Sequence, residues 1–166
     1  YLFSTDGGLL TTFTNPTPTV GGRFGGSIAA VGTDRVLIGA EGDRTGAFHA
    51  GVAHLFNTNG TLLLTFTNPT PKAGDSFGSS VAAVGTDRVL IGDHGDNTGA
   101  TSAGAAYLFS TDGALLATFT NPTPADNDYF GFSVAAVGTD RVLIGANRDD
   151  TGAVDTGAAY LFSLEL

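Results

Sequence analysis

The chain has 166 residues and a formal net charge of −9, from 16 acidic and 7 basic residues. This length supports one domain with its own hydrophobic core. The acidic balance and the lack of a basic cluster argue against binding to nucleic acid or to an anionic membrane surface, because both need positive charge. Cysteine is absent, which excludes disulfides and thiolate chemistry, and no apolar run is long enough for membrane insertion.

Read from the N-terminus, the first segment is Tyr-Leu-Phe, and it returns at a constant spacing. The copies begin at Tyr1, His54, Tyr107 and Tyr160, which are 53 residues apart without insertion or deletion. Repetition at a fixed period is typical of modular folds. We therefore treat residues 1–166 as one domain with repeats at 1–53, 54–106 and 107–159, followed by a partial strand and a tail of foreign origin at 160–166.

Each repeat is predicted to form four short strands, labelled A to D from the Phe-Gly pair that opens the first of them. The predicted spans are 24–31 for A, 35–39 for B, 51–56 for C and 62–67 for D. Gly, Thr, Val, Phe and Leu are frequent between the turns, and no helical spacing of apolar residues competes with the strand pattern.

Turn residues separate the predicted strands. Residues 32–34 connect A to B, and Thr58-Asn59-Gly60 connects C to D. The Asn-Gly pair favours a type I′ hairpin turn, in which both central residues have positive φ. The Asn-Pro-Thr-Pro segment ends strand D, because proline cannot donate to a sheet ladder. Four antiparallel strands per unit of this length indicate an all-β propeller of four-stranded blades, with three repeats per chain and both ends cut within a blade.

Strand A consists mostly of small residues and reads FGGSIAAV, FGSSVAAV and FGFSVAAV in the three repeats. The innermost strand of a blade lies close to a crowded axis, where small side chains fit. We therefore expect strand A at the centre and the Leu- and Phe-rich strand D at the outside, with the apolar side chains packed between blades.

Several short segments recur together and resemble a known repeat. The Phe-Gly pairs are Phe24-Gly25, Phe77-Gly78 and Phe130-Gly131. Strand B ends in Gly39-Ala40, Gly92-Asp93 and Gly145-Ala146. In these features the chain resembles the FG-GAP repeat of integrin α-subunit propellers and of many bacterial secreted proteins, in a variant form that lacks the final proline. The resemblance implies a β-propeller, an extracellular or cell-surface location, and a binding or adhesion role.

Many FG-GAP blades carry a calcium loop, Asp-x-Asp/Asn-x-Asp-Gly, between strands A and B. The same connection here supplies one carboxylate per repeat, from Asp34, Asp87 or Asp140, and an arginine follows each of them. Calcium takes six to eight oxygen ligands, usually from several carboxylates. We therefore expect no calcium and no cofactor at these positions, and we assign the Asp to capping the turn or to pairing with a neighbouring blade.

The repeats differ most in certain loops. Val-Gly-Thr-Asp-Arg-Val-Leu-Ile-Gly is identical in all three, whereas the D–A and B–C loops differ. The turns of a meander alternate between its two ends, so these loops are expected on one face. Loops on a rigid scaffold commonly carry recognition, and drift of longer loops is the alternative. The predicted ligand-face residues are Arg23, Asp43, Arg44, Asp75, Asp96, Asn97, Asp128, Tyr129, Asp149 and Asp150.

An Asp-x-Thr-Gly segment recurs in the B–C loop, at Asp43, Asp96 and Asp149. It predicts a turn in which side chains bond nearby backbone and glycine takes a positive φ. The alternative is a weak cation site, with calcium as the ion, formed from Asp93, Asp96, Asp150 or Asp155. The three histidines share no repeat position or ligand spacing. No catalytic motif is present, so we expect no enzyme.

Three blades are too few to close a propeller, for which four to eight are typical. The chain begins with Tyr rather than Met, within a blade, so we expect an excised piece. A homodimer of two three-blade arcs would close a six-bladed ring. A longer chain with more blades is the alternative.

The leading functional hypothesis is a secreted, non-enzymatic binding or adhesion module with a protein or glycan ligand. A purely structural or engineered propeller fragment that self-assembles without a ligand is the second hypothesis. The third is a non-catalytic propeller appended to a larger secreted enzyme.

Overall fold

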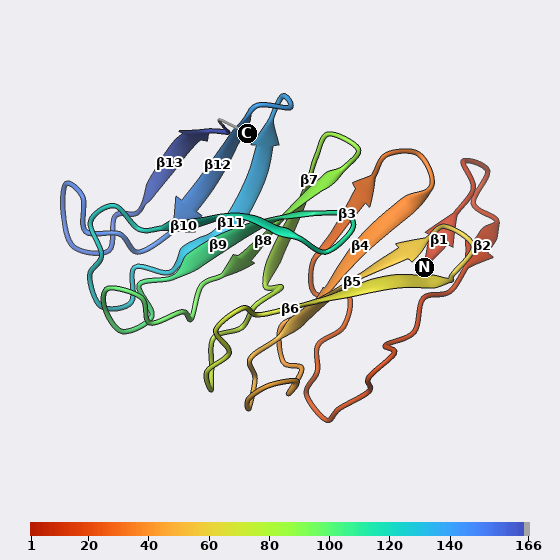
Figure 1. Ribbon diagram of the computed structural model, residues 1–166, viewed down its shortest axis with the longest axis horizontal. Helices are drawn as coiled ribbons and strands as arrows, with labels where there is room; N and C mark the ends of the chain where they lie inside the picture. Colours follow the sequence, from red (N-terminus) through yellow and green to blue (C-terminus); the bar gives the residue numbers. More distant parts are fainter. Residues whose placement is uncertain (165–166) are drawn as a thin grey trace.

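The computed structural model describes residues 1–164 and consists of β-strands without any helix (Figure 1). That part of the chain accordingly offers no helix that could cross a membrane. The strands form four antiparallel sheets, of two, four, four and three strands. The predicted all-β architecture of meandering blades is confirmed.

The N-terminal pair consists of β1 (Leu2–Phe3) and β2 (Leu9–Thr11). The first blade holds β3 (Ile28–Val31), β4 (Arg35–Ala40), β5 (Val52–Asn57) and β6 (Leu62–Thr67). The second holds β7 (Ser80–Val84), β8 (Arg88–Asp93), β9 (Ala105–Ser110) and β10 (Leu115–Thr120). The third holds β11 (Phe130–Val137), β12 (Arg141–Ala146) and β13 (Ala158–Ser163). Of the tail predicted at 160–166, residues 165–166 lie outside the described residues.

Strand A is shorter than predicted in the first two blades, because a bulge separates it from the Phe-Gly pair. The Gly78 N–H still donates to the Gly92 carbonyl across the sheet, at 2.9 Å. However, φ is +86° at Gly78, a conformation that glycine adopts without steric cost and that interrupts the ladder. In the third blade the same irregularity lies inside β11, between Phe130 and Ser133.

The prediction of a type I′ turn between strands C and D is wrong. The Gly60 N–H donates to the Asn57 carbonyl at 2.9 Å and closes a four-residue turn. Gly60 has a φ of +91°, whereas Asn59 is not among the described residues with positive φ, and type I′ needs both. The strand pairing shifts between Leu55 and Phe56. The connection is therefore a longer hairpin loop that ends in a glycine bulge.

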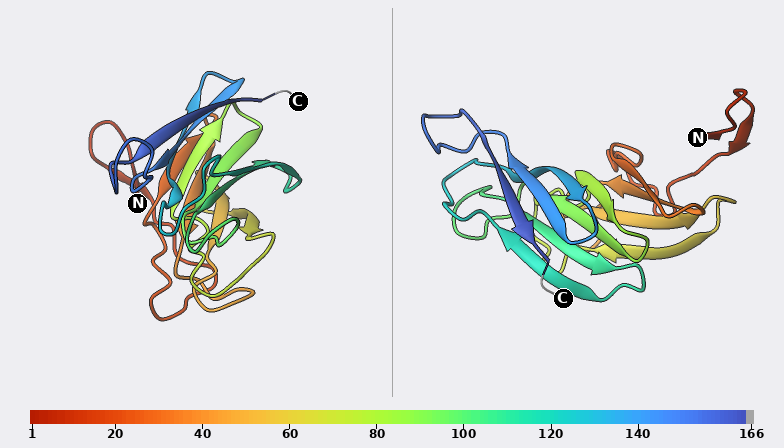
Figure 2. Two further views of the ribbon diagram at one scale, coloured as in Figure 1. Left: turned by 90° about the vertical axis from the view of Figure 1, so that its left-hand side faces the viewer. Right: turned by 90° about the horizontal axis from the view of Figure 1, so that it is seen from above.

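The blades stand side by side in chain order, with their A strands in contact (Figure 2). Strand β3 lies against β7, and β7 lies against β11. Two buried apolar clusters fill the space between neighbouring blades. The first includes Leu37, Leu55, Phe66, Phe77, Ile91 and Phe109. The second includes Leu90, Leu108, Phe119, Phe130, Val142 and Ile144. Each blade therefore buries its apolar faces against its neighbours rather than within itself.

The invariant A–B hairpin joins one blade to the next. The Arg35 guanidinium donates to the carbonyl oxygen of Thr86 in the following blade, and Arg88 donates to the Thr139 carbonyl at 2.6 Å. The Asp before Arg88 lies 3.6 Å from its Nε but stays largely exposed. The arginine, and not the Asp, thus makes the contact between blades, which explains why the arginine recurs unchanged.

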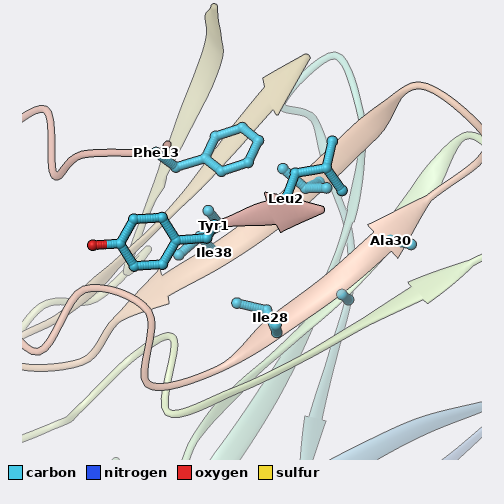
Figure 3. Close-up of a pocket in the computed structure, with 8 residues that line it drawn as sticks. Tyr1, Leu2, Phe13, Ile28, Ala30 and Ile38 are labelled. Carbon is cyan, nitrogen blue, oxygen red and sulfur yellow. The ribbon is translucent and has the colours of Figure 1, made fainter. Parts of the chain in front are cut away.

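The pair β1–β2 lies where the outer strands of a preceding blade would lie. The rings of Phe13 and Phe56 are 5.5 Å apart, which matches the 5.3 Å between Phe66 and Phe109 at a complete blade junction. Strands A and B of such a blade have no counterpart among residues 1–164. An apolar cavity of about 300 Å³ occupies their place (Figure 3), and it is lined by Tyr1, Leu2, Phe13, Ile28, Ala29, Ala30, Val36 and Ile38.

Candidate functional site

The D–A and B–C loops leave the blades at the same edge, opposite the tight turns (Figure 1). Ala40 lies opposite Val52, and Val52 lies opposite Thr67, so the loops that follow β4 and β6 start side by side. We call the edge of these loops the loop end, and the edge of the A–B and C–D turns the turn end.

Backbone hydrogen bonds connect the loops of adjacent blades. In the first junction, Gly74 N–H donates to the Phe48 carbonyl at 2.9 Å. In the second junction, Asn127 N–H donates to the Thr101 carbonyl at 2.7 Å. The B–C loop of each blade is therefore fixed against the D–A loop of the next, and the loop end forms a continuous surface.

The Asp-x-Thr-Gly segments form the predicted turns. Oδ1 of Asp43, Asp96 and Asp149 accepts a hydrogen bond from the N–H of the threonine two residues later, at 2.7–2.8 Å. The glycines that follow have φ between +86° and +103°. Each of the three Asp residues is 1% exposed. These predicted ligand-face residues therefore lie beneath the loop surface, where they stabilise the loops.

In the third blade, two buried carboxylates share an asparagine. Asn121 Nδ2 donates to Asp128 Oδ2 at 2.7 Å and to Asp149 Oδ2 at 3.2 Å. The Tyr160 hydroxyl also donates to Asp149 Oδ2, at 2.7 Å. Burial acts to raise the pKa of Asp149, but hydrogen bonds from Thr151, Tyr160 and Asn121 outweigh it and hold the pKa below its usual value. The pKa of Asp128 is raised, first by burial and then by the neighbouring negative charges.

The second blade carries three buried carboxylates at the equivalent place, from Asp75, Asp93 and Asp96. Asn68 Nδ2 donates to Asp75 Oδ2 at 2.9 Å and to Asp93 Oδ2 at 2.8 Å. The Tyr107 hydroxyl donates to Asp96 Oδ2 at 3.2 Å. Burial and the charges of its two acidic neighbours raise the pKa of Asp93 well above its usual value. Burial also raises the pKa of Asp75.

The first blade has a single carboxylate at this place. Gly22 and Ala40 stand where the second blade has Asp75 and Asp93. The remaining carboxylate, Asp43, accepts a hydrogen bond from the Thr17 hydroxyl at 2.9 Å. The three repeats therefore hold one, three and two buried carboxylates in chain order.

The asparagines that bridge these carboxylates are residues of the candidate site that the sequence analysis did not identify. Asn68 and Asn121 begin the Asn-Pro-Thr-Pro segments, which the sequence pattern presents only as strand terminators. Their recurrence 53 residues apart, each seven residues before an Asp, is the signal that could have found them. Of the alternative cation residues, Asp93 and Asp96 meet with Asp75, whereas Asp150 accepts a hydrogen bond from the Asp155 N–H in the third blade.

The other predicted ligand-face residues are exposed or half-buried. Arg23 forms an ion pair with Glu41 at 2.7 Å. The Arg44 guanidinium lies over the Phe48 ring, 4.6 Å from its centroid. Asn97 Oδ1 accepts a hydrogen bond from a backbone N–H within its own loop.

An aromatic and basic cluster lies at the loop end between the second and third blades. The His94 ring packs edge-on against Tyr129 and Phe132, at centroid distances of 5.6 and 5.7 Å. The Arg148 guanidinium lies 5.2 Å from the Tyr129 ring centroid. Phe132 is 49% exposed and replaces the Gly and Ser of the other repeats, which is the sequence signal for this cluster.

A comparison with protein families agrees with the repeated blade. A family model described as the FG-GAP repeat matches residues 66–109 and 116–162, which together make up more than half of the chain. Among solved structures, the chain is similar to the crystal structure of Kluyvelomyces marxianus Hsv2, with 10% identity and a TM-score of 0.48. That alignment covers 84% of this chain and 49% of the other, so this chain spans about half its length. A search of curated proteins found no match.

Proposed function

Because the chain belongs to the FG-GAP repeat family, we propose that it is a non-enzymatic binding module of an extracellular or cell-surface protein. The ligand binds the exposed side chains of the loop end. Propeller blades supply a rigid scaffold, and the loops that differ between repeats supply recognition.

One observation carries this proposal: the loop end presents different side chains from a repeated backbone. Arg23, Ser76 and Tyr129 occupy the same repeat position and have φ values of +53°, +67° and +57°. A backbone held in this uncommon region by its surroundings is constant, while its side chain changes from basic to small to aromatic. That combination is typical of a recognition surface on a fixed framework.

The cluster of His94, Tyr129, Phe132 and Arg148 is the centre of the proposed surface. Tyr and Arg are enriched among the residues that contribute most to binding energy, because they combine apolar area with hydrogen-bonding capacity. A protein loop or a glycan, each with both apolar and polar groups, fits this chemistry.

The test is a screen of the purified chain against a glycan array and a panel of purified extracellular proteins. Tyr129→Ala and Arg148→Ala should each weaken binding of the identified ligand by about tenfold or more, whereas Asp112→Ala at the turn end should leave its affinity unchanged. A screen without a ligand contradicts the proposal. So does a ligand whose affinity responds to Asp112 and not to the loop-end substitutions.

A second candidate function, self-assembly into a closed ring, is favoured by the first blade. Ile28 is 72% exposed beside the apolar cavity, whereas Val81, its counterpart in the second blade, packs against the core between blades. At both internal junctions, the preceding blade of the chain covers the equivalent face. We therefore propose that a second copy of the chain covers it, so that two three-blade arcs form a six-bladed homodimer.

Sedimentation equilibrium tests this assembly. The native chain should show twice the 16.7 kDa mass of one copy. Ile28→Lys should yield monomers, and Val20→Lys, in an exposed loop, should leave the dimer intact. A native chain that is monomeric up to about 100 μM, a concentration well above the Kd of a stable dimer, contradicts the proposal.

A further inference from the structure

We propose that the second blade binds a hard divalent cation, with calcium as the first candidate, between the carboxylates of Asp75, Asp93 and Asp96. All three residues are buried, at 0%, 0% and 1% exposure. The site therefore lies below the proposed ligand surface and does not depend on it. Its role is to hold the loops of this blade together.

The spacing of the carboxylates suits a single ion. One oxygen from each residue lies within 4.8 Å of those from the other two. Two oxygens bound to the same calcium ion, each about 2.3–2.6 Å from it, lie at most about 5 Å apart. The three residues come from the D–A loop, the end of β8 and the B–C loop, so an ion between them connects three separate segments.

Unpartnered carboxylate oxygens provide a second observation, independent of the clustering. Oδ1 of Asp75 and Oδ1 of Asp93 are buried and have no hydrogen-bond partner among the described residues. The Oδ2 atoms of both residues accept from the single Nδ2 of Asn68, so the two carboxyl groups face the same region. A buried charged oxygen without a donor is costly, and a cation would supply the missing partner.

Asn68 has no further hydrogen to offer these oxygens. Both hydrogens of its Nδ2 are used, one for each Asp. Its Oδ1 accepts from the Thr70 N–H at 2.8 Å, which fixes the orientation of the amide. The excess of acceptors over donors is therefore built into the arrangement.

Among the described residues of the third blade, the same arrangement has no excess of carboxylate acceptors over hydrogen-bond donors. Its two carboxylates, Asp128 and Asp149, are both served by Asn121, and Tyr160 adds another donor. The second blade adds a third carboxylate, Asp93, where the first and third blades have Ala40 and Ala146. It adds no donor with it, so the surplus of negative charge is specific to this blade.

The ligand atoms select the class of ion. All three candidate ligands are carboxylates, and oxygen ligands favour calcium, magnesium or manganese over zinc or copper. The neighbouring His94 packs its ring against Tyr129 and Phe132 instead. The site also differs in position from the A–B calcium loop that the family resemblance raised, because it lies at the loop end and not at the turn end.

Isothermal titration calorimetry with calcium chloride, on the full chain stripped with a chelator, tests the proposal. We expect one saturable site per chain, and a rise in Tm of about 5–10 °C at a hundredfold excess of calcium over Kd. Magnesium and manganese titrations identify the preferred ion. If none of the three ions shows saturable binding, the proposal is overturned.

Variants copied from the other repeats locate the site. Asp93→Ala reproduces the alanine of the first and third blades and should abolish both the binding and the shift in Tm. Asp128→Gly, the third-blade counterpart of Asp75 changed to the residue at Gly22, is the matched control and should keep one site. Binding that persists in Asp93→Ala overturns the assignment.

Introducing a second cation site in the third blade provides a test that does not depend on loss of binding. Ala146→Asp places a third carboxylate beside Asp128 and Asp149 and should raise the stoichiometry from one ion to two. A stoichiometry that stays at one contradicts the claim that the third carboxylate creates the site.

Discussion

The two ends of the blades are held together by different chemistry. At the turn end a single contact repeats, in which Arg35 and Arg88 each donate to a carbonyl of the next blade's turn. At the loop end each blade has its own number of buried carboxylates, and only the second has the full set with Asp93. The difference shows that identical turn residues make the same contact between each pair of blades, whereas the loops give each blade a different set of buried carboxylates.

The largest expected effect concerns the Phe of the Phe-Gly pair, which anchors the loop end in the core. Phe77 is 0% exposed, between the first and second blades. Phe77→Ala should lower the free energy of unfolding by about 3–5 kcal/mol, because it removes buried apolar area and leaves a cavity. In the monomeric Ile28→Lys background, Phe24→Ala should cost less, because Phe24 then lies beside the incomplete junction and is only partly buried. Urea unfolding measures both, and equal costs would contradict the assigned difference between the junctions.

The next effect is a gain of stability from removing a buried carboxyl group. With calcium chelated at pH 7, Asp93→Ala should raise the free energy of unfolding by on the order of 1–3 kcal/mol. The substitution removes a buried carboxyl group whose Oδ1 has no hydrogen-bond donor among the described residues, and with it the cost of burying that group.

The pH dependence of that gain follows from the raised pKa of Asp93. Below the ordinary Asp pKa of about 3.9 both the folded and the unfolded chain hold the proton, so the group adds no pH-dependent term. Above it the unfolded chain releases the proton first, and the stability of the native protein falls until the pH passes the raised pKa. The advantage of Asp93→Ala should therefore grow from pH 3 to pH 8, and a constant difference would refute this reasoning.

A smaller effect compares equivalent arginines at the turn end. Arg88→Ala should cost about 1–2 kcal/mol, because it removes a charged hydrogen bond to the Thr139 carbonyl from a side chain that is 19% exposed. In the monomeric Ile28→Lys background, Arg141→Ala should cost less than about 0.5 kcal/mol, because within residues 1–164 no following blade lies against its turn and its side chain is 47% exposed. Thermal unfolding of both variants measures the difference. A large cost for Arg141→Ala in the native chain would mean that its turn meets another blade in solution, as the proposed homodimer requires, whereas a large cost in the monomeric background would contradict the assigned contact.

The smallest effect concerns an exposed acidic residue of the loop end. Asp150→Asn should change the free energy of unfolding by less than about 0.5 kcal/mol and leave calcium stoichiometry unchanged, because Asp150 is exposed and accepts its hydrogen bond from its own loop, outside the second blade. A loss of calcium binding in this variant would mean that the ion binds in the third blade and not in the second.

Much of the fold could be predicted from the sequence because the repeat exposes it. The 53-residue spacing, the glycine turns and the alternation of strands determine the order of A to D, and the structure confirms that order. The C–D turn was mispredicted, because an Asn-Gly pair serves both a two-residue turn and a longer loop with a glycine bulge. Which of the two forms depends on the strand register, and the shift between Leu55 and Phe56 is not visible in the sequence.

The candidate site was harder to predict, because burial decides it. Asp43, Asp96 and Asp149 read as loop residues of a polar segment, yet side-chain contacts place them beneath the surface. Asp75 and Asp93 lie 18 positions apart in the sequence, and Asn68 donates a hydrogen bond to each of them. The contact between these side chains depends on how the two loops fold against each other, and the repeat spacing and the strand pattern do not predict that.

Hydrogen exchange of the native chain with and without calcium tests the contrast between the two ends most directly. Our account predicts slower exchange with calcium in residues 72–76 and 93–98 of the second blade, where backbone groups bond the site's own residues. Exchange at the turns and in the third blade's loops should stay unchanged. Protection that is absent, that appears equally in the loops of both blades, or that appears at the turn end would contradict it.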